Sequence, residues 1–248
     1  MHCLAVPRQL VLDPSAGVLP DSAAHHLRDV LRARPGDAVR LVDGAGSFRD
    51  ARIASVSRSG VALESAGEPG REDPPHARIT LFQCIAKPAR MDWLLEKAVE
   101  TGVSRLVPVA SARTVSRFAP GETPDRWKRI LDAALCQCGS AWGTELAPVA
   151  SWDEALAGMA ALGGPVFAGS LRPGAECAGD ALLARRGALR SLPVGWAIGP
   201  EGDFSPEELS SIEALPNAVP VSFGPRILRV ETAALFAVSA TMALALRP

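Results

Sequence analysis

The chain has 248 residues, of which 48% are hydrophobic, so it can bury the core of one large domain or two small ones. Its 26 Lys and Arg nearly balance its 27 Asp and Glu, which excludes a uniformly basic nucleic-acid coat. No apolar run reaches the length of a membrane span, and the first residues lack a signal-peptide pattern. We therefore expect a cytoplasmic protein with no membrane partner.

The cysteines do not have the spacing of metal ligands. There are five of them, and two form the Cys136-Gln137-Cys138 segment on a predicted helix, without a nearby His or further Cys. We expect no metal site, and we interpret Cys136 and Cys138 as helix-packing thiols in a reducing compartment.

The first seventy residues or so are rich in short strand-like runs separated by turns that contain Gly, Pro and Asp. One helix, Ser22–Arg34, interrupts them. Several short strands with a single helix predict a small β-barrel domain. The predicted strands are Leu10–Leu12, Ala38–Val42, Arg49–Val56 and Val61–Glu64.

The predicted Ser22–Arg34 helix carries a basic cluster that includes His26, Arg28 and Arg32. Arginine binds phosphates with paired hydrogen bonds, so the cluster predicts a contact with RNA. A solvated basic face explains the same residues, and a genome whose base composition favours arginine codons explains the scarcity of lysine.

A charged segment rich in Pro and Gly, Ala66–His76, follows the β-rich region. We interpret it as an interdomain connection. The predicted domains are residues 1–70 and 77–248, joined by a linker at 71–76.

From residue 77 onward, apolar runs typical of strands alternate with segments of helical periodicity. This pattern predicts an α/β domain with a mostly parallel sheet covered on both faces. Ligands of such sheets bind beyond the carboxyl ends of the strands. The predicted strands are Ile79–Ile85, Leu106–Val109, Val166–Ala168, Val194–Ile198 and Val219–Phe223, and the predicted helices cover Met91–Val99, Trp127–Cys138 and Ala233–Leu246.

A glycine-rich turn, Gly199–Gly202, follows the strand that ends at Ile198. The next residues, Ser205–Glu208, form the pattern of a capping box with Pro at the first helical position. Glycines let the main chain approach a ligand closely, and the motif matches neither a dinucleotide fingerprint nor a Walker loop. The turn therefore favours an adenine or ribose contact, although an ordinary strand-to-helix turn has the same pattern.

A second break, Gly224–Thr232, separates two apolar segments and carries Arg226, Arg229 and Glu231. Charge beside a core is costly unless it is paired or binds a ligand. We expect this break and Gly199–Gly202 to form one pocket. Two alternatives remain: Glu231 suits the dipole of the final helix, and Arg229 could simply pair with a glutamate.

Two basic residues, Lys87 and Arg90, stand where the first strand of the second domain ends and a helix begins. Positive charge at a helix start is unfavourable to the helix dipole, which indicates an anionic partner such as RNA phosphate.

Three stretches together resemble one family: "IGPEGDFS", "FGPRILRVETA" and "AKPARMDWLLEKAVETGVSRLVPV". They stand in the order and spacing of the RsmE-type methyltransferases of the SPOUT superfamily. The N-terminal "HHLRDVLRARPGDAVRLVDGAG" is similar to the PUA-like domain of that family. The resemblance covers nearly the whole chain.

The resemblance implies a C-terminal domain with a deep trefoil knot, which is a rare exception to unknotted topology. It implies a homodimer that binds S-adenosylmethionine in the knot and methylates N3 of a single uridine in the 16S rRNA of the small ribosomal subunit. It also implies that the PUA-like domain helps to hold the RNA.

Carried over by residue, the resemblance assigns the cofactor to the two breaks and to nearby strand ends. Arg229 and Glu231 match the basic and acidic positions next to the methyl group. The expected cofactor-binding residues are Gly169, Ile198, Gly199, Pro200, Glu201, Gly202, Phe223, Gly224, Ile227, Leu228 and Arg229, and the expected RNA-binding residues are His26, Arg28, Arg32, Lys87, Arg90 and Arg226.

The chain departs from the family pattern at four places. Asp203 replaces a usual Gly, Val230 a usual Thr, and Thr101 a common Leu. Ser140–Trp142 replaces a basic or amide-bearing segment, which puts one RNA or cofactor contact in doubt.

For catalysis we expect Glu231 or Glu201 to accept the uracil N3 proton and Arg229 to stabilise charge on the uracil carbonyls. Ribose 2′-O-methylation and a non-catalytic RNA-binding protein are the alternatives. A nicotinamide oxidoreductase lacks its glycine fingerprint here.

Overall fold

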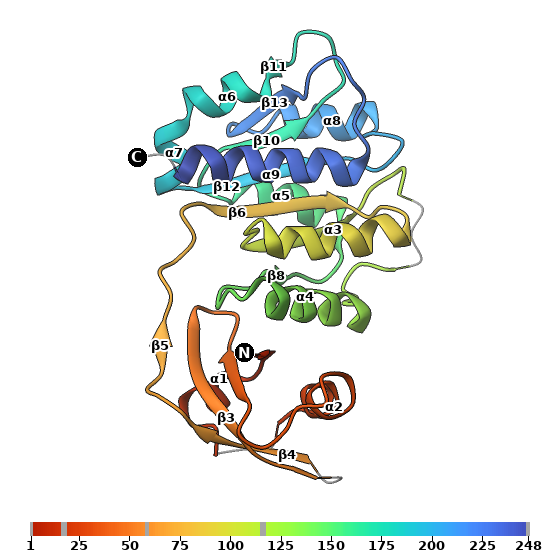
Figure 1. Cartoon of the computed structure of the whole chain (residues 1–248). Helices are drawn as coiled ribbons and strands as arrows, with labels where there is room; N and C mark the ends of the chain where they lie inside the picture. Colours follow the sequence, from red (N-terminus) through yellow and green to blue (C-terminus); the bar gives the residue numbers. More distant parts are fainter. Residues whose placement is uncertain (1, 16–18, 58–59, 115–117, 247–248) are drawn as a thin grey trace. The chain divides into compact units, whose positions relative to one another are not determined.

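The computed structural model describes residues 2–15, 19–57, 60–114 and 118–246. The chain forms two compact units (Figure 1). The first contains residues 1–74 together with 131–143, and the second contains residues 75–130 and 144–248. Across the described ranges, no helix is long and apolar enough to cross a membrane.

The first unit is built on a five-stranded sheet in the order β1-β2-β3-β4, with β5 paired to β3. β1 runs parallel to β2, and the other pairs are antiparallel. The elements are β1 (His2–Ala5), α1 (Arg8–Leu12), α2 (Asp21–His25), the π-helical turn η1 (His26–Val30), β2 (Ala38–Val42), β3 (Ser47–Ser57), β4 (Gly60–Ser65) and β5 (Gly70–Arg71).

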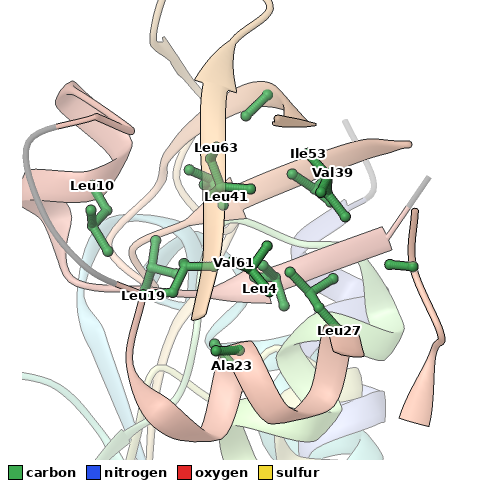
Figure 2. Close-up of a cluster of buried hydrophobic side chains, with 14 of the residues drawn as sticks. Leu4, Leu10, Leu19, Ala23, Leu27, Val39, Leu41, Ile53, Val61 and Leu63 are labelled. Atoms are coloured by element: carbon green, nitrogen blue, oxygen red, sulfur yellow. The ribbon is translucent and has the colours of Figure 1, made fainter. Parts of the chain in front are cut away.

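One apolar cluster forms the core of this unit (Figure 2). Val39 and Leu41 alternate along β2, Ile53 comes from β3, and Leu27 comes from η1; all four are at most 1% exposed. Period-two alternation on the strands places one face of the sheet against the helices, as half-buried sheets require.

Two predictions for the first unit are wrong. Leu10–Leu12 belongs to helix α1, which begins after Pro7, and adjacent Leu10 and Val11 are both buried, as a short helix allows and an alternating strand does not. The helix predicted to reach Arg34 ends at Val30. Its first part is α2, and its last five residues form the π-helical turn η1. Arg32 then takes a left-handed backbone conformation with φ 51°.

The segment interpreted as a linker contains a short strand, because β5 pairs with β3. Next to it, the Glu72 carboxylate accepts the main-chain N–H of Ala141 at 2.8 Å, and the Trp142 indole N–H donates to the Glu72 carbonyl at 3.3 Å. A Cβ on Gly46 would lie 2.5 Å from the Trp142 ring, so only glycine leaves room for that ring. Ser140–Trp142, the departure from the family pattern, is therefore part of the packing of the first unit.

The second unit contains an eight-stranded sheet in the order β11-β13-β10-β12-β6-β7-β8, with β9 paired to β7, and all pairs are parallel. The elements are β6 (Arg78–Cys84), α3 (Pro88–Glu100), β7 (Arg105–Ala110), α4 (Asp125–Cys138), β8 (Glu145–Leu146), β9 (Ala150–Ser151), α5 (Trp152–Ala160), β10 (Val166–Gly169), β11 (Glu176–Cys177), α6 (Ala178–Ala184), α7 (Arg186–Ser191), β12 (Pro193–Ile198), α8 (Pro206–Glu213), β13 (Ala218–Ser222) and α9 (Val230–Leu246). α4 crosses the boundary between the two units.

Helices cover both faces of this sheet. On one face, Val166 and Ala168 of β10 pack in a cluster with apolar residues of α5 and α8. On the other, α3 and α9 lie side by side, and α9 runs across the near face of the sheet in Figure 1. There Phe167 stacks on Trp196 with ring centroids 4.9 Å apart, and the Trp196 indole donates to the buried Thr241 hydroxyl at 3.0 Å.

The parallel sheet covered on both faces is confirmed, and each predicted strand of the second unit matches an observed one within a residue or two. The buried face of α3 consists of apolar residues at helical spacing within the predicted Met91–Val99 helix, namely Met91, Leu94, Leu95, Ala98 and Val99. On α4, by contrast, Cys138 is exposed, so its interpretation as a packing thiol is wrong. Cys136 is partly buried and accepts the main-chain N–H of Ala5 at 3.2 Å.

Candidate active site

A cavity of about 290 Å³ lies at the carboxyl ends of β10, β12 and β13. β10 pairs with both β12 and β13, so the loops that follow these three parallel strands meet at one edge of the sheet. Every predicted cofactor residue except Gly202 lines this cavity, and Arg90 and Arg226 line it as well. The two sequence breaks are therefore brought together as expected.

Close packing at the base of the cavity depends on Gly169. A Cβ there would lie 3.0 Å from the Phe223 ring, tighter than nearly all such contacts in proteins. Phe223 continues an aromatic series, with its ring centroid 5.8 Å from Trp196 and 5.6 Å from Phe236. The second break can turn away at this point because Gly224 adopts φ 96°, a conformation that glycine reaches without strain.

The first break is a tight turn in which the Asp203 N–H donates to the Pro200 carbonyl at 2.9 Å. Asp203 adopts φ 60°, and its carboxylate accepts the N–H of Phe204 at 2.9 Å. Asp is among the few residues besides Gly that tolerate this conformation, which explains how it replaces the glycine of the family pattern. The predicted capping box at the start of α8 is confirmed, with both reciprocal bonds between Ser205 and Glu208.

Arg90 joins the two candidate carboxylates. Its Nη1 lies 3.2 Å from Glu201 Oε1, and its Nε lies 3.9 Å from Glu231 Oε2. Glu201 Oε1 also accepts the main-chain N–H of Lys87 at 3.2 Å. Among the described residues, Arg229 has no ion pair with either carboxylate, so the alternative that it merely balances them is wrong.

Glu231 lies in the first turn of α9, as predicted, and its side chain is 13% exposed. Its Oε2 is buried and has no hydrogen-bond partner in the described part of the chain. The Arg90 guanidinium, 3.9 Å away, balances the charge of this oxygen without a hydrogen bond, and Glu231 is not among the residues that line the cavity.

The predicted RNA-binding residues are divided between the two units. His26 and Arg28 belong to η1 in the first unit, and Arg28 donates to neighbouring Asp29 through both Nε and Nη2. Lys87 is exposed at the start of α3 in the second unit, and Arg226 lines the cavity. Within the described ranges, no three His, Cys, Asp or Glu side chains gather as metal ligands.

One residue of the site was not predicted. The Arg113 guanidinium, in the loop after β7, donates to the carbonyl of Gly202 at 2.6 Å and to that of Phe204 at 3.3 Å. Gly202 therefore faces Arg113 and does not line the cavity. The sequence offers only an isolated Arg beyond a strand, which is too common a pattern to select it.

This fold and site define an α/β protein that binds a ligand between the loops at the carboxyl edge of a parallel sheet. The family model of an RNA methyltransferase domain matches residues 72–242, and that of an RNA methyltransferase PUA domain matches residues 19–64. The chain therefore belongs to the RNA methyltransferase family and carries a PUA domain before its methyltransferase domain.

Relatives match the chain over almost its whole length. Ribosomal RNA small subunit methyltransferase E of Bacillus subtilis is 28% identical over 96% of this chain and 94% of its own. A crystal structure of the protein of that name from Neisseria gonorrhoeae, bound to S-adenosyl methionine, has a TM-score of 0.81 and 29% identity, with 98% of each chain covered. A probable rRNA methyltransferase from Porphyromonas gingivalis has a TM-score of 0.80 and 29% identity, again covering 98% of each chain.

Proposed function

We propose that this chain transfers a methyl group from S-adenosylmethionine to N3 of a single uridine in the 16S rRNA of the small ribosomal subunit. The observation that carries the proposal is the cavity formed by the two breaks, because the residues expected to hold the cofactor converge there from three separate strands. The Neisseria relative was crystallised with this cofactor.

The residues of the cavity fit S-adenosylmethionine. Ile198 and Leu228 offer apolar side chains for the adenine, and the glycine-rich turn offers main-chain donors and acceptors for the adenine and ribose. Glu201 lines the cavity and, with Glu231 just outside the lining, shares the single Arg90 guanidinium, so two carboxylates face one positive side chain beside the site of a cationic ligand. The bound cofactor would supply a methyl group on a positively charged sulfur.

Transfer of this methyl group is an in-line displacement, so positioning of the uracil carries much of the rate. The N3 proton must leave, and we assign its acceptance to Glu231, with Glu201 as the second candidate. Arg229 would stabilise negative charge on the uracil carbonyls. Arg90 would hold both carboxylates in place through its contacts of 3.2 and 3.9 Å.

We assign RNA contacts to His26, Arg28 and Arg32 of the PUA domain and to Lys87, Arg90 and Arg226 of the methyltransferase domain. Positive side chains of this kind bind the phosphate backbone, and a target base must leave its stack to reach an enclosed site. Action on ribosomal RNA supports the cytoplasm as the proposed location.

We also propose domain limits at 1–70 and 77–248, a barrel-like N-terminal sheet and a trefoil knot in the second domain. β10 lies between β12 and β13 in the sheet although it precedes both in the chain, so the chain leaving β12 must pass β10 to form β13. This crossing supports the knot.

A homodimer is the proposed assembly. α9 is buried along one side, but Phe236 is 47% exposed and Leu246 is 59% exposed on the same helix. Apolar side chains left open on an Ala-rich helix favour a second subunit as their cover. Sedimentation at micromolar concentration tests this, and a clean monomer would contradict it.

Methyl transfer to small subunits from a strain that lacks the native activity tests the function. We expect radiolabel to enter 16S rRNA, and nuclease digestion with mass spectrometry to recover 3-methyluridine. A ribose-methylated nucleoside would support the 2′-O alternative. Failure to bind S-adenosylmethionine in calorimetry would support a non-catalytic RNA-binding protein.

A further inference from the structure

Residues 111–114, which follow β7, form a compact turn that is fixed by its own side chains. The Ser111 and Thr114 hydroxyls lie 2.7 Å apart, and the Thr114 N–H donates to the Ser111 carbonyl at 3.0 Å. This turn presents Arg113 to the segment that follows β12, although β6 lies between β7 and β12 in the sheet. The contact is therefore not a consequence of strand pairing.

Arg113 binds the main chain of the first break on both sides of Asp203. Its Nη1 is 2.6 Å from the Gly202 carbonyl and 3.3 Å from the Phe204 carbonyl. Between these carbonyls, Asp203 holds φ 60°, a conformation that non-glycine residues seldom adopt. A charged donor to two carbonyls stabilises this peptide geometry more than a neutral donor would.

The same loop makes a second contact with this segment. The Ala112 N–H donates to the Glu208 carboxylate at 2.7 Å, and Glu208, which is 6% exposed, also caps α8. The residue before Gly202 is fixed as well. The Glu201 carboxylate accepts hydrogen bonds from the main-chain N–H of Lys87 and from the Arg90 guanidinium, each at 3.2 Å. Gly199–Glu201 line the cavity, whereas the Gly202 carbonyl is held by Arg113.

We propose that Arg113 is a positioning residue for the cofactor, which holds the Gly199–Asp203 turn in the shape that receives S-adenosylmethionine. The inference rests on the proposed function, because it names a determinant of the same site. Arg113 does not line the cavity, so its effect on the cofactor passes through the main chain of the turn.

Calorimetric titration of S-adenosylmethionine into the full-length chain tests the proposal. We expect Arg113→Met to raise Kd about tenfold, the size of effect that one hydrogen bond from a charged donor supports. Arg113→Lys, which keeps the charge and one donor, should recover part of the loss. Arg52→Met is the matched control, because Arg52 also donates to a main-chain carbonyl, that of Gly36 at 3.2 Å, but in the first unit.

Loss of folded protein is distinguishable from loss of positioning. A partly unfolded variant lowers the binding stoichiometry, whereas loss of positioning raises Kd at full stoichiometry and leaves affinity for the RNA unchanged. Wild-type Kd in Arg113→Met, or an equal rise in Arg52→Met, would overturn the inference. Absence of binding by the wild-type chain would instead overturn the proposed function.

Discussion

The two units differ in how the sequence determines their functional surface. In the second unit, the candidate residues follow parallel strands, and strand order alone brings them to one edge of the sheet. In the first unit, the basic cluster was expected on one helix, but the helix changes to a π-helical turn and ends before Arg32. A site at strand ends can thus be predicted from the order of the strands in the sheet. A site on a short helix depends on the residue at which that helix ends.

The largest expected effect concerns Glu231, the proposed proton acceptor in the second unit. We expect Glu231→Gln to lower the rate of methyl transfer at least about 100-fold, since a positioned proton acceptor contributes that much or more, with S-adenosylmethionine binding largely kept. Radiolabel incorporation into small subunits measures the rate. Glu145→Gln is the control, because Glu145 pairs with Arg105 at 3.4 Å outside the cavity. Near-wild-type turnover of Glu231→Gln would remove Glu231 from the mechanism.

A core substitution in the first unit tests whether the cavity depends on that unit. Leu41 is fully buried on β2, so Leu41→Ala should lower the free energy of unfolding of the first unit by about 2–5 kcal/mol. Denaturant unfolding measures the loss, and calorimetry at low denaturant should return the wild-type Kd for S-adenosylmethionine. A large rise in Kd would show that the two units are not independent.

A buried hydrogen bond behind the cavity gives a smaller effect. Thr241 accepts the Trp196 indole N–H at 3.0 Å and is itself fully buried. Thr241→Val keeps the shape but leaves that N–H without an acceptor, which costs about 1–3 kcal/mol of unfolding free energy. Thr241→Ser retains the hydroxyl and serves as the control. If valine and serine destabilise equally, packing and not the hydrogen bond is what matters at this position.

The smallest effect concerns the Arg40–Asp50 pair of the first unit. The hydrogen bond from Arg40, with Nε 2.7 Å from the carboxylate, lowers the pKa of Asp50 below its usual value. A carboxyl whose pKa falls on folding stabilises the protein above its unfolded pKa, and this contribution is lost as pH drops through the folded pKa. Because Asp50 is 43% exposed, we expect no more than about 1 kcal/mol.

Unfolding of Asp50→Asn and wild type between neutral pH and pH 3 measures this contribution. The difference in stability should shrink as the pH falls. A difference that stays constant over this range would mean that the charge of Asp50 plays no part.

Much of the second unit could be predicted because its strands are apolar runs and α3 has a complete helical face. The helices α5, α6 and α7 were not predicted, since each is short and has few buried residues. The role of Arg113 could not be predicted, because it depends on a contact across 89 residues of sequence. The ion pairs of Arg90 could not be predicted either. Arg90 was expected to bind RNA, and its guanidinium also pairs with two carboxylates.

The inclusion of residues 131–143 in the first unit has a consequence for synthesis of the chain. Glu72 and Gly46 pack against Ala141 and Trp142, so the N-terminal unit lacks part of its structure until residue 143 has left the ribosome. By then β6, α3 and β7 have already emerged. The N-terminal unit therefore cannot finish folding before synthesis of the second unit has started. A fragment that ends at residue 74 would leave Glu72 without its Ala141 partner and the space beside Gly46 without Trp142.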